Sequence, residues 1–107
     1  MYTVIRKYTD ASALIDEMAR RPNDVERVIT NIPGFIAYHA IRDGSTLVTV
    51  SICQDSRGAD ETTREAAKWV RENLPAGSVA PPEITVGDAF LSFGSASAAQ
   101  TAAAART

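Results

Sequence analysis

The chain has 107 residues, of which 45% are hydrophobic and 22% charged, and its formal net charge is −2. This length suits one domain with one core, because a chain of this size buries roughly two-thirds of its unfolded surface. No apolar run approaches the roughly 18 residues of a membrane span, and the interleaved charges do not form the basic stripe of a nucleic-acid binder. We therefore expect a soluble globular domain with neither a membrane nor a nucleic-acid partner.

Two features indicate the compartment. The single cysteine, Cys53, cannot form an internal disulfide, which agrees with a reducing environment. The first strand-like run begins almost at Met1 with no charged and apolar leader before it, so we expect no secretory signal. Both observations favour a cytoplasmic protein.

The first third of the chain predicts a strand followed by a helical segment. Residues 2–8 are rich in β-branched and aromatic side chains, as strands are, and Thr9 and Asp10 offer short polar side chains that cap helices. Because Pro22 lacks an amide N–H, we expect a kink or two abutting helices at that point. Apolar residues on both sides of it keep a helical spacing, and they are Leu14, Met18, Val25, Ile29 and Ile32.

Residues 35–42 and 46–53 read as two strands around Asp43-Gly44, a dipeptide typical of a type I′ hairpin turn. With a loop of these two residues, His39 is expected to face Val48, and alternate residues share one face of the sheet. The more apolar face would carry Phe35, Ala37, His39, Ile41, Val48, Val50 and Ile52. The other would carry Ile36, Tyr38, Ala40, Leu47, Thr49, Ser51 and Cys53. We expect helices to cover the more apolar face.

A second helix is predicted from about Arg57 or Asp60 to Leu74, where Pro75 stops it, with Trp69 at the edge of its apolar stripe. After a loop rich in glycine and proline, residues 83–93 read as a last strand with a bulge at Gly87.

The element order β-α-β-β-α-β predicts an α+β, ferredoxin-like fold, in which a four-stranded antiparallel sheet carries two helices on one face. Residues 1–94 form this domain. Residues 95–107 consist mainly of alanine, serine and threonine, so they are expected to be a low-complexity tail.

Two helices leave the second face of the sheet uncovered. With Ile36, Tyr38, Ala40 and Leu47, that face is too apolar for a sheet washed by water. A homodimer that packs sheet on sheet about a twofold axis would bury it. A monomer with Tyr38 and Leu47 semi-exposed is the alternative.

Several segments together resemble the dimeric α/β-barrel superfamily, specifically its antibiotic biosynthesis monooxygenase-like branch. These segments are the strand start at Tyr2–Arg6, the Ile32-Pro33-Gly34-Phe35 junction, the hairpin, the helix end from Trp69 to Pro75, and the last strand. The resemblance spans roughly residues 1 to 94. It implies a pocket between sheet and helices, in which cofactor-independent members oxidise aromatic polyketides or quinols with molecular oxygen and other members degrade haem.

His39 is the candidate catalytic residue, because it is the only histidine and a neutral imidazole can move protons at physiological pH. The expected register places it on the helix-covered face beside Phe35. The alternative is a buried histidine with a satisfied hydrogen bond. No cluster of metal-ligating residues has the required spacing, so neither a metal nor a cofactor is expected.

Trp69, Tyr8 and Phe35 are the candidate substrate-binding residues. The resemblance includes haem-degrading relatives in which a tryptophan of the second helix presses on the porphyrin, and Trp69 lies in that helix. The tyrosines, which are Tyr2, Tyr8 and Tyr38, could donate hydrogen bonds to a quinone or phenol oxygen. For all of these aromatic side chains, core packing is the alternative. Haem-degrading relatives use an asparagine in strand one, where this chain has Arg6 and Lys7, and a histidine after the tryptophan, which this chain lacks. We therefore do not expect haem degradation.

Two functions remain open on this basis. One is a cofactor-independent monooxygenase that acts on a small aromatic or quinol substrate. The other is a homodimer that binds a small ligand, or serves as a scaffold, without catalysis.

Overall fold

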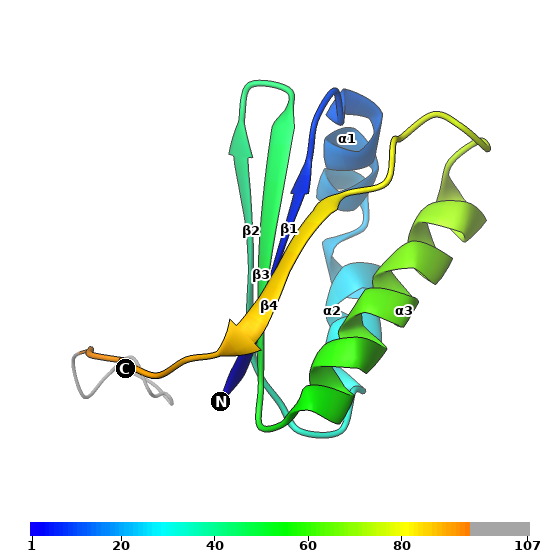
Figure 1. Ribbon diagram of the computed structural model, residues 1–107. Helices are drawn as coiled ribbons and strands as arrows, with labels where there is room; N and C mark the ends of the chain where they lie inside the picture. The colour runs from blue at the N-terminus through cyan, green and yellow to red at the C-terminus, as the bar shows by residue number, and fades with distance from the viewer. Residues whose placement is uncertain (95–107) are drawn as a thin grey trace.

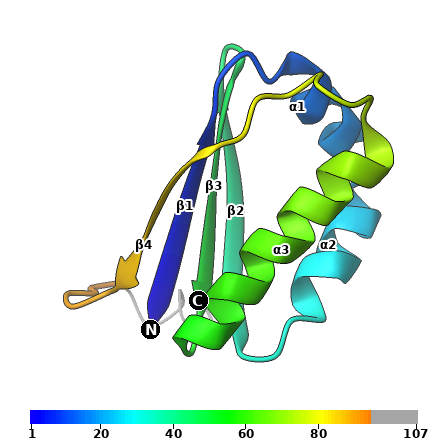
Figure 2. The same cartoon turned by 45° about the vertical axis from the view of Figure 1, so that its right-hand side comes forward.

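The computed structural model describes residues 1–94, so the predicted tail at residues 95–107 lies outside the described residues. Its elements are β1 (Tyr2–Tyr8), α1 (Ser12–Arg20), α2 (Pro22–Thr30), β2 (Phe35–Asp43), β3 (Thr46–Cys53), α3 (Ser56–Asn73) and β4 (Glu83–Asp88). The strands form one antiparallel sheet in the order β2-β3-β1-β4. All three helices lie on one face of the sheet (Figures 1 and 2). The predicted ferredoxin-like α+β fold is confirmed.

The first helical segment is broken where the proline predicts. Pro22 is the first residue of α2, a position at which its missing N–H removes no helical hydrogen bond. The predicted cap by Thr9 or Asp10 is wrong, because α1 begins only at Ser12 and Ala11 takes the capping position without a side-chain hydrogen bond. No helix within residues 1–94 combines the length and the apolar character needed to cross a membrane.

Helix α3 starts against the end of the hairpin. The Asp55 side chain caps it by accepting a hydrogen bond from the Gly58 amide at 3.1 Å. A Cβ atom on Gly58 would lie only 3.0 Å from the Pro33 carbonyl oxygen and 3.1 Å from the Cys53 Cβ. Glycine at this position therefore lets the helix approach the hairpin closely.

The last strand is shorter than predicted. β4 ends at Asp88 because its partner β1 ends there too: Tyr2 pairs with Asp88, and no earlier strand residue is left to pair. The predicted bulge at Gly87 is also wrong, since Gly87 pairs with Thr3 in an unbroken register.

The hairpin turn lies one residue later than predicted. Its loop is Gly44-Ser45, Asp43 pairs with Thr46, and His39 consequently faces Val50. Only Gly44 has a positive φ, of 60°. A turn of type II′ needs a positive φ at its first loop residue alone, whereas the predicted type I′ turn needs it at both. The pairing moves by two residues along β3, which leaves the face of each residue from Ala37 to Cys53 unchanged.

The choice of covered face is wrong. The helices bury Leu47, Thr49, Ser51 and Cys53, while Val48, Val50 and Ile52 are half-buried on the uncovered face with the exposed Ile41 and His39. A bulge between Phe35 and Ala37 brings Phe35 opposite Cys53, on the covered side. The physical reason for the polar covered face is Arg6, which pairs with Thr49 in the sheet and points the same way.

Candidate functional site

A small cavity of ≈ 40 Å³ lies between the sheet and the helices. Aliphatic side chains from α1, α2, α3 and β3 form most of its wall. The remaining wall is polar or aromatic and consists of Arg6, Tyr8, Tyr38, Thr49, Glu65 and Trp69. The cavity therefore combines an apolar surface with a few polar groups, which is the usual composition of a small-molecule site.

Arg6 is the most unusual residue of this wall, because its side chain is only 1% exposed. Its guanidinium donates hydrogen bonds to four hydroxyl oxygens, those of Thr49 at 3.5 Å, Ser51 at 3.1 Å, Thr63 at 3.2 Å and Thr62. Within residues 1–94 no carboxylate forms an ion pair with it, and its Nε has no hydrogen-bond partner.

The charge state of Arg6 follows from its chemistry. Burial lowers the pKa of its guanidinium, but an arginine in a protein stays protonated at neutral pH. The buried guanidinium of Arg6 thus has hydroxyl groups, and no carboxylate of residues 1–94, as its hydrogen-bond partners.

Tyr8 and Tyr38 place two phenol groups beside this charge. Burial raises the pKa of Tyr8, and it raises the pKa of Tyr38 to about 12; the charge of Arg6 offsets part of the effect in both. Both hydroxyls consequently stay protonated at neutral pH and are able to donate hydrogen bonds to a ligand oxygen.

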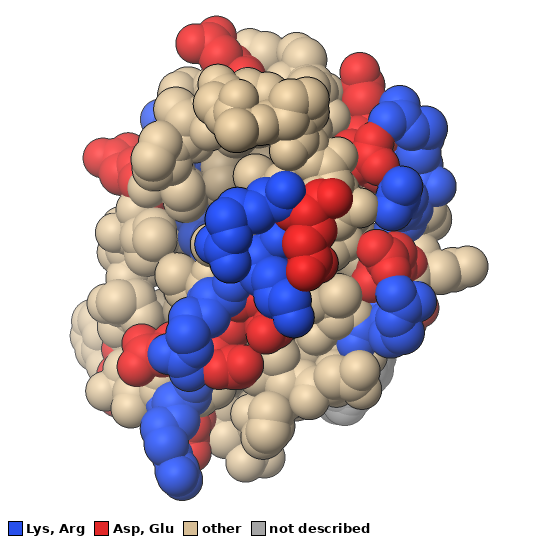
Figure 3. Space-filling view, turned by 90° about the vertical axis from the view of Figure 1, so that its right-hand side faces the viewer, with Lys and Arg blue, Asp and Glu red and all other residues tan. Residues whose placement is uncertain are grey.

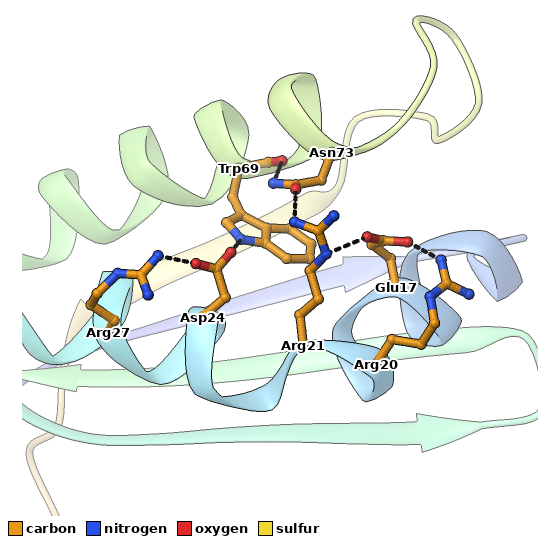
Figure 4. Close-up of polar contacts among 7 residues, drawn as sticks. All are labelled: Glu17, Arg20, Arg21, Asp24, Arg27, Trp69 and Asn73. Carbon is orange, nitrogen blue, oxygen red and sulfur yellow. Dashed lines mark hydrogen bonds and ion pairs between the residues drawn. The ribbon is translucent and has the colours of Figure 1, made fainter.

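Trp69 closes the cavity on the side of α2 and α3. Its indole Nε1 donates a hydrogen bond to Asp24 Oδ2 at 2.9 Å, which ties α3 to α2 (Figure 4). This hydrogen bond is the main reason that the pKa of Asp24 is lowered, and the neighbouring Arg27 adds to the effect. The indole is thereby held at a defined orientation against the cavity.

A chain of polar contacts continues this tie along the outside of the helices. Arg21 donates to Asn73 Oδ1 at 2.7 Å and pairs with Glu17 at 2.8 Å, and Glu17 also pairs with Arg20 (Figure 4). Lys and Arg side chains lie next to Asp and Glu over the same side of the molecule (Figure 3). Side-chain hydrogen bonds and ion pairs therefore link the three helices that pack over the cavity.

A larger groove of ≈ 710 Å³ adjoins the cavity between α1, α2 and β2. Phe35 lines this groove. The two spaces share part of their walls, namely Met18, Val25, Ile29, Tyr38 and Leu47. These shared side chains lie between the small cavity and the larger groove.

The structure brings together only part of the predicted site. Tyr8 and Trp69 line the cavity and Phe35 lines the groove beside it. His39 is exposed on the uncovered face, so its predicted location is wrong; as predicted, it lies on the face opposite Cys53.

Arg6 and Glu65 were not predicted as site residues. A sequence signal for Arg6 existed, because alternation in strand one places it on the same face as Val4 and Tyr8. The part of the chain that the structure describes contains no group of three or more histidine, cysteine, aspartate or glutamate side chains that could hold a metal.

No protein-family model matches the chain, and no curated protein matches it. Several solved structures are similar to it. A protein of unknown function from Nitrosomonas europaea has 19% identity and a TM-score of 0.66, over 89% of this chain and 94% of that one. SnoaB, a cofactor-independent oxygenase from Streptomyces nogalater, has 14% identity and a TM-score of 0.60, over 88% and 97% of the two chains.

Another similar structure is the heme-degrader MhuD from Mycobacterium tuberculosis, with 11% identity and a TM-score of 0.62, over 88% of this chain and all of that one. Further similar structures are described as antibiotic biosynthesis monooxygenases. The chain has the fold of the antibiotic biosynthesis monooxygenases. The resemblance inferred from the sequence is therefore confirmed at the level of structure. At these identities the antibiotic biosynthesis monooxygenase fold is established, and the reaction is not.

Proposed function

We propose that the protein is a cofactor-independent monooxygenase that oxidises a small aromatic or quinol substrate in the cavity between sheet and helices. The observation that carries this proposal is the buried Arg6 beside the protonated hydroxyls of Tyr8 and Tyr38 in an otherwise apolar cavity. The similarity to a cofactor-independent oxygenase, and to a monooxygenase solved with the ligand nanaomycin D, supports the same class of reaction.

The residues of the cavity suit oxidation by molecular oxygen. A phenol or quinol reacts with oxygen more readily after losing its hydroxyl proton, and a fixed positive charge stabilises the phenolate that results. In the overall reaction one atom of O₂ becomes a quinone carbonyl, the other leaves as water, and the substrate supplies both hydrogens. Arg6 would stabilise the phenolate, and Tyr8 and Tyr38 would donate hydrogen bonds to it.

Glu65 is the proton acceptor in this proposal. It is a half-buried carboxylate of α3 that lines the cavity, whereas His39 lies across the sheet from it. Carboxylates act as general bases in many enzymes, provided that they lie within reach of the substrate proton.

A substrate ring needs more room than the small cavity offers. A volume of ≈ 40 Å³ accommodates a few water molecules at most. The adjoining groove is far larger, and only side chains such as Met18 and Tyr38 separate the two spaces. We infer that the substrate arrives through the groove and displaces these side chains.

Oxygen consumption with a panel of quinols and naphthoquinols tests the reaction. We expect Glu65→Gln to lower kcat by about 10²-fold or more, as loss of a general base does, and His39→Ala to leave it unchanged. Absence of turnover with every substrate would contradict the monooxygenase and favour the second candidate, a homodimer that binds a small ligand without catalysis.

We propose a homodimer for either function. The uncovered face of the sheet exposes 40% of Ile5 and 53% of Ile41, next to the half-buried Val48, Val50 and Ile52. A contiguous apolar surface of this kind supports burial against a second copy of the chain. The predicted interface residues Tyr38 and Leu47 lie on the other, helix-covered face, so they are replaced by this set.

A further inference from the structure

The buried charge of Arg6 poses a physical question beyond the class of reaction. An ionised group that is almost fully removed from water is costly unless an opposite charge or several hydrogen bonds compensate it. Arg6 is 1% exposed and has four hydroxyl partners, yet no anion within residues 1–94 pairs with it.

The hydroxyl partners hold the guanidinium in place and leave its Nε without a hydrogen bond. The terminal nitrogens are engaged by Thr49 and Ser51 of β3 and by Thr62 and Thr63 of α3. The Nε–H, in contrast, is buried and has no partner within residues 1–94, and the Arg6 side chain forms part of the cavity wall. A group fixed in this way is preorganised to bind an anion and loses little conformational freedom when it does.

We propose that the cavity binds its ligand as an organic monoanion, an aromatic ring with an ionised oxygen, whose charge is paired with the buried guanidinium of Arg6. This inference rests on the cavity that the proposed function uses, but it requires binding only and no reaction with oxygen.

The other ionisable groups around the guanidinium agree with a negative ligand. Tyr8, Tyr38 and Cys53 are close enough to influence it, and burial raises the pKa of all three, so they are neutral at pH 7. Glu65, on α3, is the carboxylate of the cavity wall, and it makes no ion pair with Arg6. Arg6 and Glu65 are thus the two charged residues of the cavity wall, and the guanidinium is the one that attracts an anion.

The pKa of a bound phenol measures this pairing directly. The probe is 4-nitrophenol, whose phenolate absorbs visible light and can be titrated in the presence of saturating protein, without oxygen. A cation within about 4–6 Å lowers the pKa of an acid by about 1 or more, so we expect the bound probe to ionise at a pH at least about 1 lower than in water. By linkage, the phenolate should bind about tenfold tighter than the neutral phenol.

Two variants separate ligand pairing from a purely structural role of the arginine. Arg6→Met removes the charge at similar volume and should abolish the lowering, whereas Arg6→Lys keeps the charge and should retain part of it. Circular dichroism verifies that both fold. If neither does, the pKa of the probe on the unaltered protein still decides the matter, because a guanidinium out of reach of the bound probe would leave that pKa unchanged.

Competition identifies the kind of anion. Benzoate should displace the bound phenolate if carboxylates are accepted, and its failure to do so would restrict the ligand to phenolates; the neutral isostere benzamide should not displace it. An unshifted or raised pKa for the bound probe, or equal affinity for 4-nitrophenolate and neutral 4-nitroanisole, would overturn the inference. A lowered pKa without oxygen consumption on any quinol would leave it standing and contradict only the proposed reaction.

Discussion

At the residue scale, Arg6 explains why the covered face of this sheet is polar. Thr49 and Ser51 are buried on it although they are less apolar than Val48 and Val50, because their hydroxyls accept hydrogen bonds from the guanidinium. A charged hydrogen bond of this type stabilises a protein by about 1.5–3 kcal/mol, and an unsatisfied buried group costs a similar amount. A serine or threonine is therefore the favoured neighbour of a buried arginine.

The Trp69–Asp24 hydrogen bond is a second residue-scale feature, and it has a pH dependence. The bond holds the pKa of Asp24 below its ordinary value of 3.8. A carboxylate with a lowered folded-state pKa stabilises the protein above the unfolded value and loses that contribution as the pH falls through the folded value.

We therefore expect the Tm difference between the unaltered protein and Asp24→Asn to be constant from pH 7 to about pH 5 and to shrink below pH 3.8. The asparagine oxygen still accepts the indole hydrogen bond, so the variant isolates the charge. Thermal unfolding followed by the fluorescence of the single tryptophan measures this difference. Glu26→Gln, at an exposed position of the same helix, is the control, and an identical pH profile in both variants would contradict the prediction.

At the element scale, the hairpin shows how one backbone angle sets a register. Because Gly44 has a positive φ and its neighbours Asp43 and Ser45 do not, the loop is Gly44-Ser45, and the pairing of β2 with β3 follows from it. The bulge at Phe35 then moves that ring to the covered side, where it lines the groove. The position of one glycine in the turn and the extra residue in β2 thus determine which aromatic side chains reach the site.

Gly44→Ala should destabilise the fold by about 1–2 kcal/mol, because a Cβ is strained at a φ of 60°. Gly87→Ala is the matched control: its φ is not in the positive region and no atom lies within 4 Å of the added methyl group, so we expect neutrality or a gain of a few tenths of a kcal/mol. Urea unfolding gives both values. Equal effects at the two positions would show that the turn does not require the left-handed conformation.

At the scale of the whole molecule, the two faces of the sheet have different roles. One packs against three helices and encloses the cavity, and the other exposes the apolar surface that we assign to a homodimer. Figures 1 and 2 show that the described helices all lie on the cavity side, so none of them covers this surface.

Val50→Lys, in the middle of the uncovered face, should convert the dimer to a folded monomer, because a dimer would bury two charges against each other. The control is Val86→Lys: Val86 is 52% exposed and pairs with Val4, so it lies on the opposite face. Sedimentation velocity measures the mass of each. A dimer that survives Val50→Lys, or is lost equally in Val86→Lys, would place the interface elsewhere.

Much of this architecture was predictable because it depends on local patterns. The strand at Tyr2–Tyr8, the helix break at Pro22 and the apolar stripe of the helices follow from alternation, a missing amide and helical spacing. The cap of α1 and the end of β4 were not predictable in this way. The cap depends on where the chain leaves the preceding turn, and the end of β4 depends on where its distant partner strand ends.

By itself, the sequence determined the order of the elements, the two faces of the hairpin beyond the bulge at Phe35, and the aromatic residues Tyr8 and Trp69 of the candidate site. Only the tertiary structure decided which face the helices cover, and with it the positions of His39 and Arg6. The apolar pattern predicted the wrong face, because the covered face contains a buried guanidinium. This guanidinium donates hydrogen bonds to hydroxyl groups of β3 and α3 that lie more than 40 positions away along the chain. Such a polar cluster is visible only when the strands and the helix are packed together.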